Sequence, residues 1–143
     1  NMVVLGSSIG WQCFLGVLSL GYDKCVGYEI MPSQVEVSNQ LSTSLQLEQR
    51  VEFVCQDALS GSIANAGLIW LNSYAWGTEA KKSISRKIIQ EAELGARVVS
   101  YEPLDVVALD GCPQTLVLQD TFSIEASWNP RSTAYVYSVE EAA

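Results

Sequence analysis

A short run of small residues near the start of the chain could do chemistry in two ways. Gly6-Ser7-Ser8-Ile9-Gly10 fits G-x-S-x-G, the strand-to-helix turn that presents a nucleophilic serine in hydrolases. With one substitution, the same run fits the glycine-rich turn that carries a nucleotide-like cofactor. Both turns stand between a strand and a helix, so the run alone does not separate a reactive serine from a ligand-binding loop.

Other features of the sequence bear on these two interpretations. A serine nucleophile needs a base, most often histidine, and the chain contains no histidine. A hydrolase would need a lysine partner for Ser8 or a histidine from outside this sequence.

The dinucleotide pattern G-x-G-x-x-G requires a third glycine, and Trp11 stands after Gly10 instead. The G-x-G-x-G loop of S-adenosylmethionine sites remains, with Ser8 at its middle position. A tight turn that binds no ligand is the alternative.

Three polar residues that follow predicted strands favour the cofactor loop. Glu29 ends one strand, where a carboxylate can accept hydrogen bonds from both hydroxyls of a ribose. Asp57 follows the next strand and can accept a hydrogen bond from an adenine amine, and Asn72 follows the one after, beside the expected sulfonium. Each alone is more often a surface acid or a turn residue. Because the carboxyl ends of parallel strands share one edge of a sheet, together they predict a binding crevice there.

Short apolar runs bounded by turn residues predict the strands that position these side chains. The expected strands are Met2–Leu5, Lys24–Tyr28, Val51–Cys55, Gly67–Leu71, Ala96–Tyr101, Thr115–Ile124 and Thr133–Tyr137. The last two are separated by the short turn Trp128-Asn129-Pro130-Arg131, which indicates an antiparallel hairpin at one edge of the sheet.

Apolar residues at helical spacing predict three helices between the strands. The first stops near Gly21, the second opens at Pro32, and the third runs over residues 78–94. Their recurring apolar positions are Cys13, Phe14, Val17 and Leu18, then Val37, Leu41 and Leu45 on one face, and then Ile84, Ile88, Ile89 and Ala92 facing inward. Alternating strands and helices predict an α/β fold, a three-layer, Rossmann-like and mostly parallel sheet with a C-terminal antiparallel hairpin, in a single domain over residues 1–143.

The composition narrows the class of protein. The 143 residues are 48% hydrophobic and 17% charged, which suits one globular domain with a substantial core. A net charge of -8 with only eight scattered basic residues argues against direct nucleic-acid binding. No run of roughly 18 uncharged apolar residues exists, which argues against a signal peptide or a membrane span. The chain reaches a strand by Val3, so we expect a further segment before Asn1 in the natural protein.

The cysteines indicate a cellular compartment. Cys13, Cys25, Cys55 and Cys112 never form C-x-x-C, so no metal site is expected. We expect reduced, buried thiols, which are typical of a cytoplasmic or nuclear protein.

Longer motifs carry a family resemblance. The segments are LGSSIG (5–10), VGYEI (26–30), QDAL (56–59), IWLNSYAWGTE (69–79), ARVVSYEPL (96–104) and SWNPRSTAYVY (127–137). On these segments the chain resembles the seven-strand, Rossmann-like class I methyltransferases over nearly its whole length. Within them it is most similar to the non-SET histone lysine methyltransferases of the disruptor-of-telomeric-silencing type.

The resemblance implies S-adenosyl-L-methionine as cofactor, S-adenosyl-L-homocysteine as product, and a protein lysine amine as acceptor. Asn72 and Tyr74 would be the catalytic residues, with Trp76 shaping the acceptor channel, while Trp70 and Trp128 are expected in the core. The implied cofactor-binding residues are Gly6, Ser7, Ser8, Gly10, Glu29, Ile30, Asp57, Ala58 and Asn72. A cofactor-binding module without transfer activity is the alternative function.

The chain also departs from the family pattern. The acid usual two residues before the first loop glycine is Val4 here, and the glutamine typical after the last loop glycine is Trp11. The family's upstream helices, lid loop and basic nucleosome-binding segment have no counterpart in this sequence.

Overall fold

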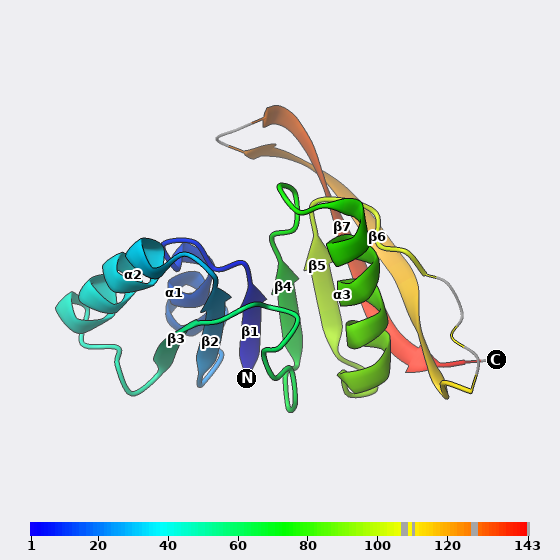
Figure 1. The fold of residues 1–143 in the computed structure, drawn as a ribbon, viewed down its shortest axis with the longest axis horizontal. Helices are drawn as coiled ribbons and strands as arrows, with labels where there is room; N and C mark the ends of the chain where they lie inside the picture. The colour runs from blue at the N-terminus through cyan, green and yellow to red at the C-terminus, as the bar shows by residue number, and fades with distance from the viewer. Residues whose placement is uncertain (107–108, 110, 127–128, 143) are drawn as a thin grey trace.

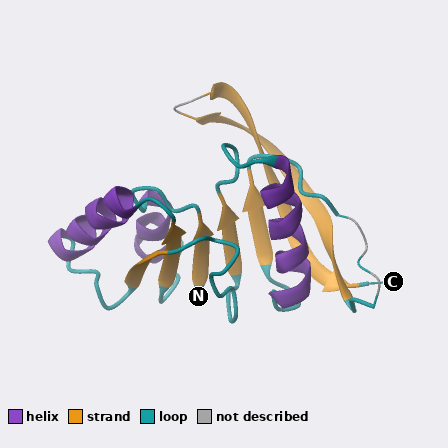
Figure 2. Cartoon of the chain, viewed as in Figure 1, coloured by secondary structure: helices purple, strands orange, loops and turns teal. Residues whose placement is uncertain are grey.

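The computed structural model describes residues 1–106, 109, 111–126 and 129–142. In this part of the chain, seven strands form a single sheet in the order β3-β2-β1-β4-β5-β7-β6, flanked by helices (Figures 1 and 2). The elements are β1 (Met2–Leu5), α1 (Trp11–Leu18), β2 (Cys25–Glu29), α2 (Pro32–Ser44), β3 (Val51–Cys55), β4 (Leu68–Leu71), α3 (Thr78–Glu91), β5 (Arg97–Ser100), β6 (Gln114–Ala126) and β7 (Asn129–Glu141).

The central strands are apolar on both faces because each face is covered. In β1, Met2 and Val4 belong to the core formed with α1 and α2, while Val3 and Leu5 belong to the core formed with α3. All four are buried, as expected for a parallel strand between two helical layers. The strands β1 to β5 pair in parallel, and β7 pairs antiparallel with both β5 and β6. The predicted fold class is therefore confirmed.

The first and third helices bury the faces that the sequence predicts, with small differences at their ends. In α1, Cys13, Phe14 and Val17 are buried, but Leu18 is exposed at the end of the helix. In α3, all four predicted inward residues are buried, and the helix ends at Glu91 rather than at residue 94. Among the described residues, no helix combines the length and apolar character that crossing a bilayer requires.

The second helix presents a different face to the sheet from the one that its apolar spacing suggests. Its exposed residues include Val37, Leu41 and Leu45, and its buried ones are Val35, Ser38 and Ser42. Ser38 is small enough to lie directly against the loop after β1, and its hydroxyl donates to the carbonyl oxygens of Ser8 (3.1 Å) and Gln34 (2.9 Å). A hydrogen-bonded serine such as Ser38 can thus occupy a helix interface from which hydrophobic periodicity alone would exclude it.

The C-terminal hairpin is longer than predicted. Its register runs from Gln114 opposite Glu141 to Ala126 opposite Asn129, so residues 129–131 belong to β7 and not to the turn. Trp128, expected in the core, lies outside the described residues. In Figure 1 the far end of the hairpin rises beyond the edge of the sheet at which the parallel strands end.

The cysteines confirm the expectation of buried thiols only in part. All four are unpaired, and Cys13 and Cys25 are buried, whereas Cys55 is exposed and Cys112 is half-buried. A hydrogen bond with the Cys25 side chain, together with burial, raises the pKa of the Cys13 thiol. Cys55 ends the edge strand β3, whereas Cys112 packs partly buried against the core formed with α3.

Candidate functional site

The loop after β1 is built from small residues because its backbone is left-handed at three places. Gly6, Ser8 and Gly10 have φ values of 78°, 49° and 84°. Ser8 thus adopts the conformation for which glycine is the usual residue at the middle position of the loop. A Cβ atom on Gly10 would stand 2.3 Å from the Phe53 ring, and one on Gly6 would stand 2.9 Å from the Asn72 carbonyl oxygen. The two glycines therefore let the loop pack closely on β3 and on the end of β4.

Glu29, at the end of β2, faces this loop. Its Oε2 accepts a hydrogen bond from the backbone N–H of Ser8 at 2.9 Å, and its Oε1 accepts one from the N–H of Met31 at 3.0 Å. Charged hydrogen bonds of this kind are stronger than neutral ones and fix the carboxylate between two loops. The side chain that the sequence predicts for ribose binding therefore points toward the small-residue turn.

Asp57 lies after β3 on the same edge of the sheet. Its Oδ1 accepts a hydrogen bond from the backbone N–H of Leu59 at 2.9 Å, which makes a local side-chain turn. The turn leaves Asp57, Ala58 and Leu59 lining the same cavity as Glu29. Asp57 can therefore both close the local turn and line the cavity.

Asn72 connects three elements. Its Nδ2 donates to the carbonyl oxygen of Gly6 at 2.8 Å, and its Oδ1 accepts from Nε2 of Gln12 at 3.2 Å. The buried Oε1 of Gln12 has no hydrogen-bond partner among the described residues. An amide oxygen can accept two hydrogen bonds, so Oδ1 of Asn72 keeps one acceptor position.

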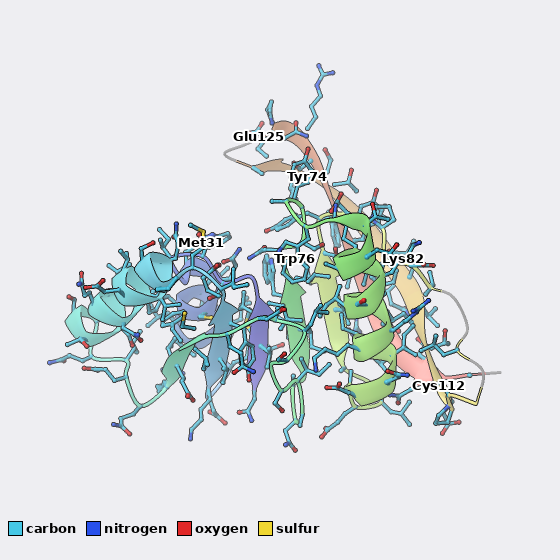
Figure 3. All side chains as sticks on the ribbon, in the orientation of Figure 1. Met31, Tyr74, Trp76, Lys82, Cys112 and Glu125 are labelled. Carbon is cyan, nitrogen blue, oxygen red and sulfur yellow. The ribbon has the colours of Figure 1, made fainter. Side chains whose placement is uncertain are left out.

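The loop from Tyr74 to Trp76, which follows β4, also lines the cavity. Tyr74 is 59% exposed, whereas Trp76 is half-buried and packs against the core. Figure 3 shows both on the edge of the sheet where Met31 also lies. In α3, Nζ of Lys81 lies 2.7 Å and 2.9 Å from the two carboxylate oxygens of Glu102 and 3.3 Å from the Tyr74 carbonyl oxygen. This single ammonium ties the loop to the end of β5.

These elements enclose a cavity of about 820 Å³. The predicted residues that line it are Gly6, Ser8, Glu29, Ile30, Asp57, Ala58, Asn72, Tyr74 and Trp76. Ser7 and Gly10 do not line it. Ser7 is buried against Gly27, where an added Cβ would stand 2.7 Å away, and Gly10 faces Phe53. Both support the loop from behind.

Several lining residues were missed by the sequence analysis. They include Ile9, Trp11, Gln12, Tyr28, Met31, Leu59 and Tyr101. Gln12 stands one position after the place where the family pattern has its glutamine. Tyr101 directly follows β5, but the predicted strand extends through Tyr101, so the strand-end rule that selects Asn72 does not select Tyr101. Burial raises the pKa of Tyr101, although side-chain hydrogen bonds with Trp70 and Gln12 oppose that rise.

The described residues that line the cavity include carboxylates and no lysine or arginine. Glu29 and Asp57 contribute negative charge. Within the same residues, no group of three or more cysteine or acidic side chains is placed to hold a metal ion. The site therefore suits hydroxyl, amine or cationic groups better than phosphates.

No protein-family model matches the sequence, and no curated protein does. Solved structures do resemble the fold. An RNA methyltransferase from Salinibacter ruber, in complex with S-adenosyl-L-homocysteine, is 19% identical with a TM-score of 0.70, and the match covers 99% of this chain and 82% of that one. A putative rRNA methylase from Clostridium thermocellum is 13% identical with a TM-score of 0.69, over 100% and 88% of the two chains.

An rRNA methylase from Streptococcus thermophilus is similar to the same degree. It is 14% identical with a TM-score of 0.68, and the match covers 98% of this chain and 86% of that one. These matches span nearly all of the chain at low identity. The chain has the Rossmann-like fold of the class I methyltransferases.

Proposed function

We propose that the protein is an S-adenosylmethionine-dependent methyltransferase. The observation that carries the proposal is the convergence of Glu29, Asp57 and Asn72 on one cavity beside the left-handed turn of Gly6 and Ser8. The fold supports it, since the Salinibacter ruber protein of similar structure is described in complex with S-adenosyl-L-homocysteine.

The residues present fit the proposed cofactor by chemistry and position. Glu29 would accept hydrogen bonds from the ribose hydroxyls, and Asp57 with Ala58 would meet the adenine, with Ile30 as an apolar neighbour. Helix α1 begins after Gly10, with no side-chain cap among the described residues, so the backbone N–H groups of its first turn can receive a carboxylate. The absence of lysine and arginine from the described lining fits a cofactor without phosphates.

When bound, the cofactor supplies a methyl group on a positively charged sulfur, so the protein needs neither a nucleophile nor a metal of its own. The protein's contribution is alignment, which can lower a barrier by about 7–11 kcal/mol. Asn72, held by Gly6 and Gln12, would orient the attacking group through the free acceptor position on its Oδ1. Tyr74 and Trp76 would exclude water from the path of transfer.

We further propose a protein lysine amine as the acceptor, as the family resemblance implies. A lysine with pKa near 10.4 must lose its proton before it attacks, and an apolar aromatic channel favours the neutral amine. The exposed Tyr74 and the half-buried Trp76 both provide aromatic walls of the cavity. The similar structures from Salinibacter ruber and Clostridium thermocellum are described as RNA and putative rRNA methylases. This chain's charge of -8 disfavours a polyanionic acceptor.

The experiment is methyl transfer from tritiated S-adenosylmethionine into a cell extract that is then separated into protein, nucleic acid and small molecules. Label in the protein fraction, at lysine after hydrolysis, supports the full proposal. Label only in nucleic acid overturns the lysine assignment and leaves the methyltransferase assignment intact. Calorimetric titration with S-adenosylhomocysteine and, separately, NAD precedes it, and binding of NAD alone would overturn the cofactor assignment.

A cofactor-binding module without transfer activity is the second candidate, favoured by one observation. Val4, at the position of the family's usual acid, is fully buried among apolar residues, so no carboxylate reaches the cofactor from there. Binding of S-adenosylhomocysteine without label in any fraction of the extract would support this second candidate over the first.

A further inference from the structure

A second hollow lies beside the cavity, on the face of the sheet that carries α1. It is a groove of about 580 Å³, and it shares Trp11 and Tyr101 with the cavity. Its floor is formed by Val99, Val136 and Ala134, side chains of β5 and β7. The groove has the size of a typical small-molecule site.

The groove exists because no described helix covers this part of the sheet. Helices α1 and α2 pack on β1, β2 and β3, whereas α3 packs on the opposite face. On the uncovered face, Trp70 of β4 is paired in register with Val99 of β5, and Val99 with Val136 of β7. Phe122 of β6 lies opposite Ala134 of β7, so a large ring borders a small floor residue. This alternation of small and large side chains gives the groove depth.

Its walls are aromatic. Trp11 and Trp70 meet edge to face with ring centroids 6.2 Å apart, and Trp70 and Tyr101 lie 6.3 Å apart at a tilt of 59°. Phe122 borders the other side, 50% exposed, and Trp11 is 47% exposed. Aromatic rings that face an open groove can add stacking and edge-to-face contacts with a planar ligand.

The charge around the groove limits the ligand further. Glu125 is the charged side chain among the described lining residues, and no lysine or arginine is found there. A ligand with a carboxylate or phosphate would meet this negative charge without a compensating cation, inside a protein of net charge -8.

We propose that this groove is a binding site for a planar aromatic molecule without anionic groups. Its lining contains none of the side chains proposed for the cofactor, although Trp11 and Tyr101 line both the groove and the cavity. It does not depend on the proposed function. A ligand held there would lie next to the cavity.

The test uses quinoline as the probe and its 2-carboxylate as the anionic counterpart, measured by equilibrium dialysis with the whole chain. Phe122→Ala removes one wall of the groove. Leu118→Ala is the matched control, because Leu118 is also 50% exposed, on the same strand, and is absent from the groove lining. Titration with S-adenosylhomocysteine in the same samples reports on the cofactor cavity separately, and circular dichroism verifies that both variants are folded.

We expect quinoline to bind and the carboxylate to bind at least tenfold more weakly. Phe122→Ala should weaken quinoline binding by about fivefold or more, the loss expected for one aromatic contact, and Leu118→Ala should change it less than twofold. Absence of quinoline binding, equal effects of the two variants, or equal binding of the carboxylate overturns the proposal. Sedimentation that reveals a dimer dispersed by Phe122→Ala also overturns it, in favour of a second copy on this face. Quinoline binding without S-adenosylhomocysteine binding would refute the proposed function alone.

Discussion

The two ends of the cavity are built differently. At the end near β2, the Glu29 carboxylate is held by two backbone N–H groups, those of Ser8 and Met31. At the end near α3, Tyr74 is exposed, and its loop is tied to β5 through the Lys81 ammonium and Glu102. One end is positioned by main chain and buried packing, the other by flexible side chains.

This difference suggests a division of labour between the two ends. The loop that contains Ser8 packs on Phe53 through Gly10 and accepts a hydrogen bond from Ser38, so it cannot move far without disrupting the core. The end near β2 therefore suits a constant ligand. Exposed side chains on a loop can rearrange and vary, so the end near α3 suits a partner that has to enter and leave. Substitutions at the two ends should therefore differ in kind as well as in size.

The largest effect should follow from Gly10→Ala, which attacks the packed end. The new Cβ would stand 2.3 Å from the Phe53 ring, which is buried and held edge to face against Phe14. With the strain of φ at 84°, we expect the free energy of unfolding in urea to fall by about 2–4 kcal/mol.

Gly95→Ala is the matched control for this change. Gly95 has φ of 83°, but its added Cβ would meet no heavy atom within 4 Å. Only the left-handed backbone should then destabilise the variant, and the free energy of unfolding should fall by about 1–2 kcal/mol. Equal losses in the two variants would mean that the contact with Phe53 does not constrain the loop.

The next effect should follow from Glu29→Ala. Loss of charged hydrogen bonds to the ribose should weaken S-adenosylhomocysteine binding by about 1.5–3 kcal/mol in calorimetric titration. Glu36→Ala, an exposed acid on α2, should leave the affinity unchanged. If Glu29→Ala binds as the unaltered protein does, Glu29 only joins the two loops and the constant ligand does not bind at this end.

The smallest effect should follow from Lys81→Met at the other end. The Lys81–Glu102 pair is about 30% exposed on each side, so a double-mutant cycle should give a coupling of about 1 kcal/mol in unfolding free energy. The neighbouring Lys82–Glu79 pair, 3.3 Å apart and more exposed, should give less than about 0.5 kcal/mol. A larger coupling for Lys82 than for Lys81 would contradict the claim that Lys81 ties the loop.

The sequence predicts which strand-end side chains lie together at this edge of the sheet, because local rules govern their placement. Residues that end buried parallel strands must share one edge of the sheet, which brings Glu29, Asp57 and Asn72 to the cavity. The left-handed conformation of Ser8 also agrees with its place at the middle position of the G-x-G-x-G pattern, where glycine is usual. These signals need no knowledge of distant contacts.

Features that depend on distant contacts could not be predicted in this way. The inward face of α2 is decided by Ser38 meeting the loop of Ser8, a contact across 30 positions in sequence. The role of Gln12 depends on Asn72, 60 positions away. Strands β6 and β7 extend beyond their predicted limits because they pair with each other. The additional residues lack a clear alternation of apolar and polar side chains, so the sequence pattern does not reveal them as strand.

The most direct test is a crystal structure of the protein grown with S-adenosyl-L-homocysteine. We expect the ribose hydroxyls to lie within hydrogen-bonding distance of the Glu29 carboxylate, and the homocysteine end to lie near Gly6 and Asn72. A ligand bound elsewhere, or a folded protein that takes up none while Glu29 still holds Ser8 and Met31, would contradict this expectation.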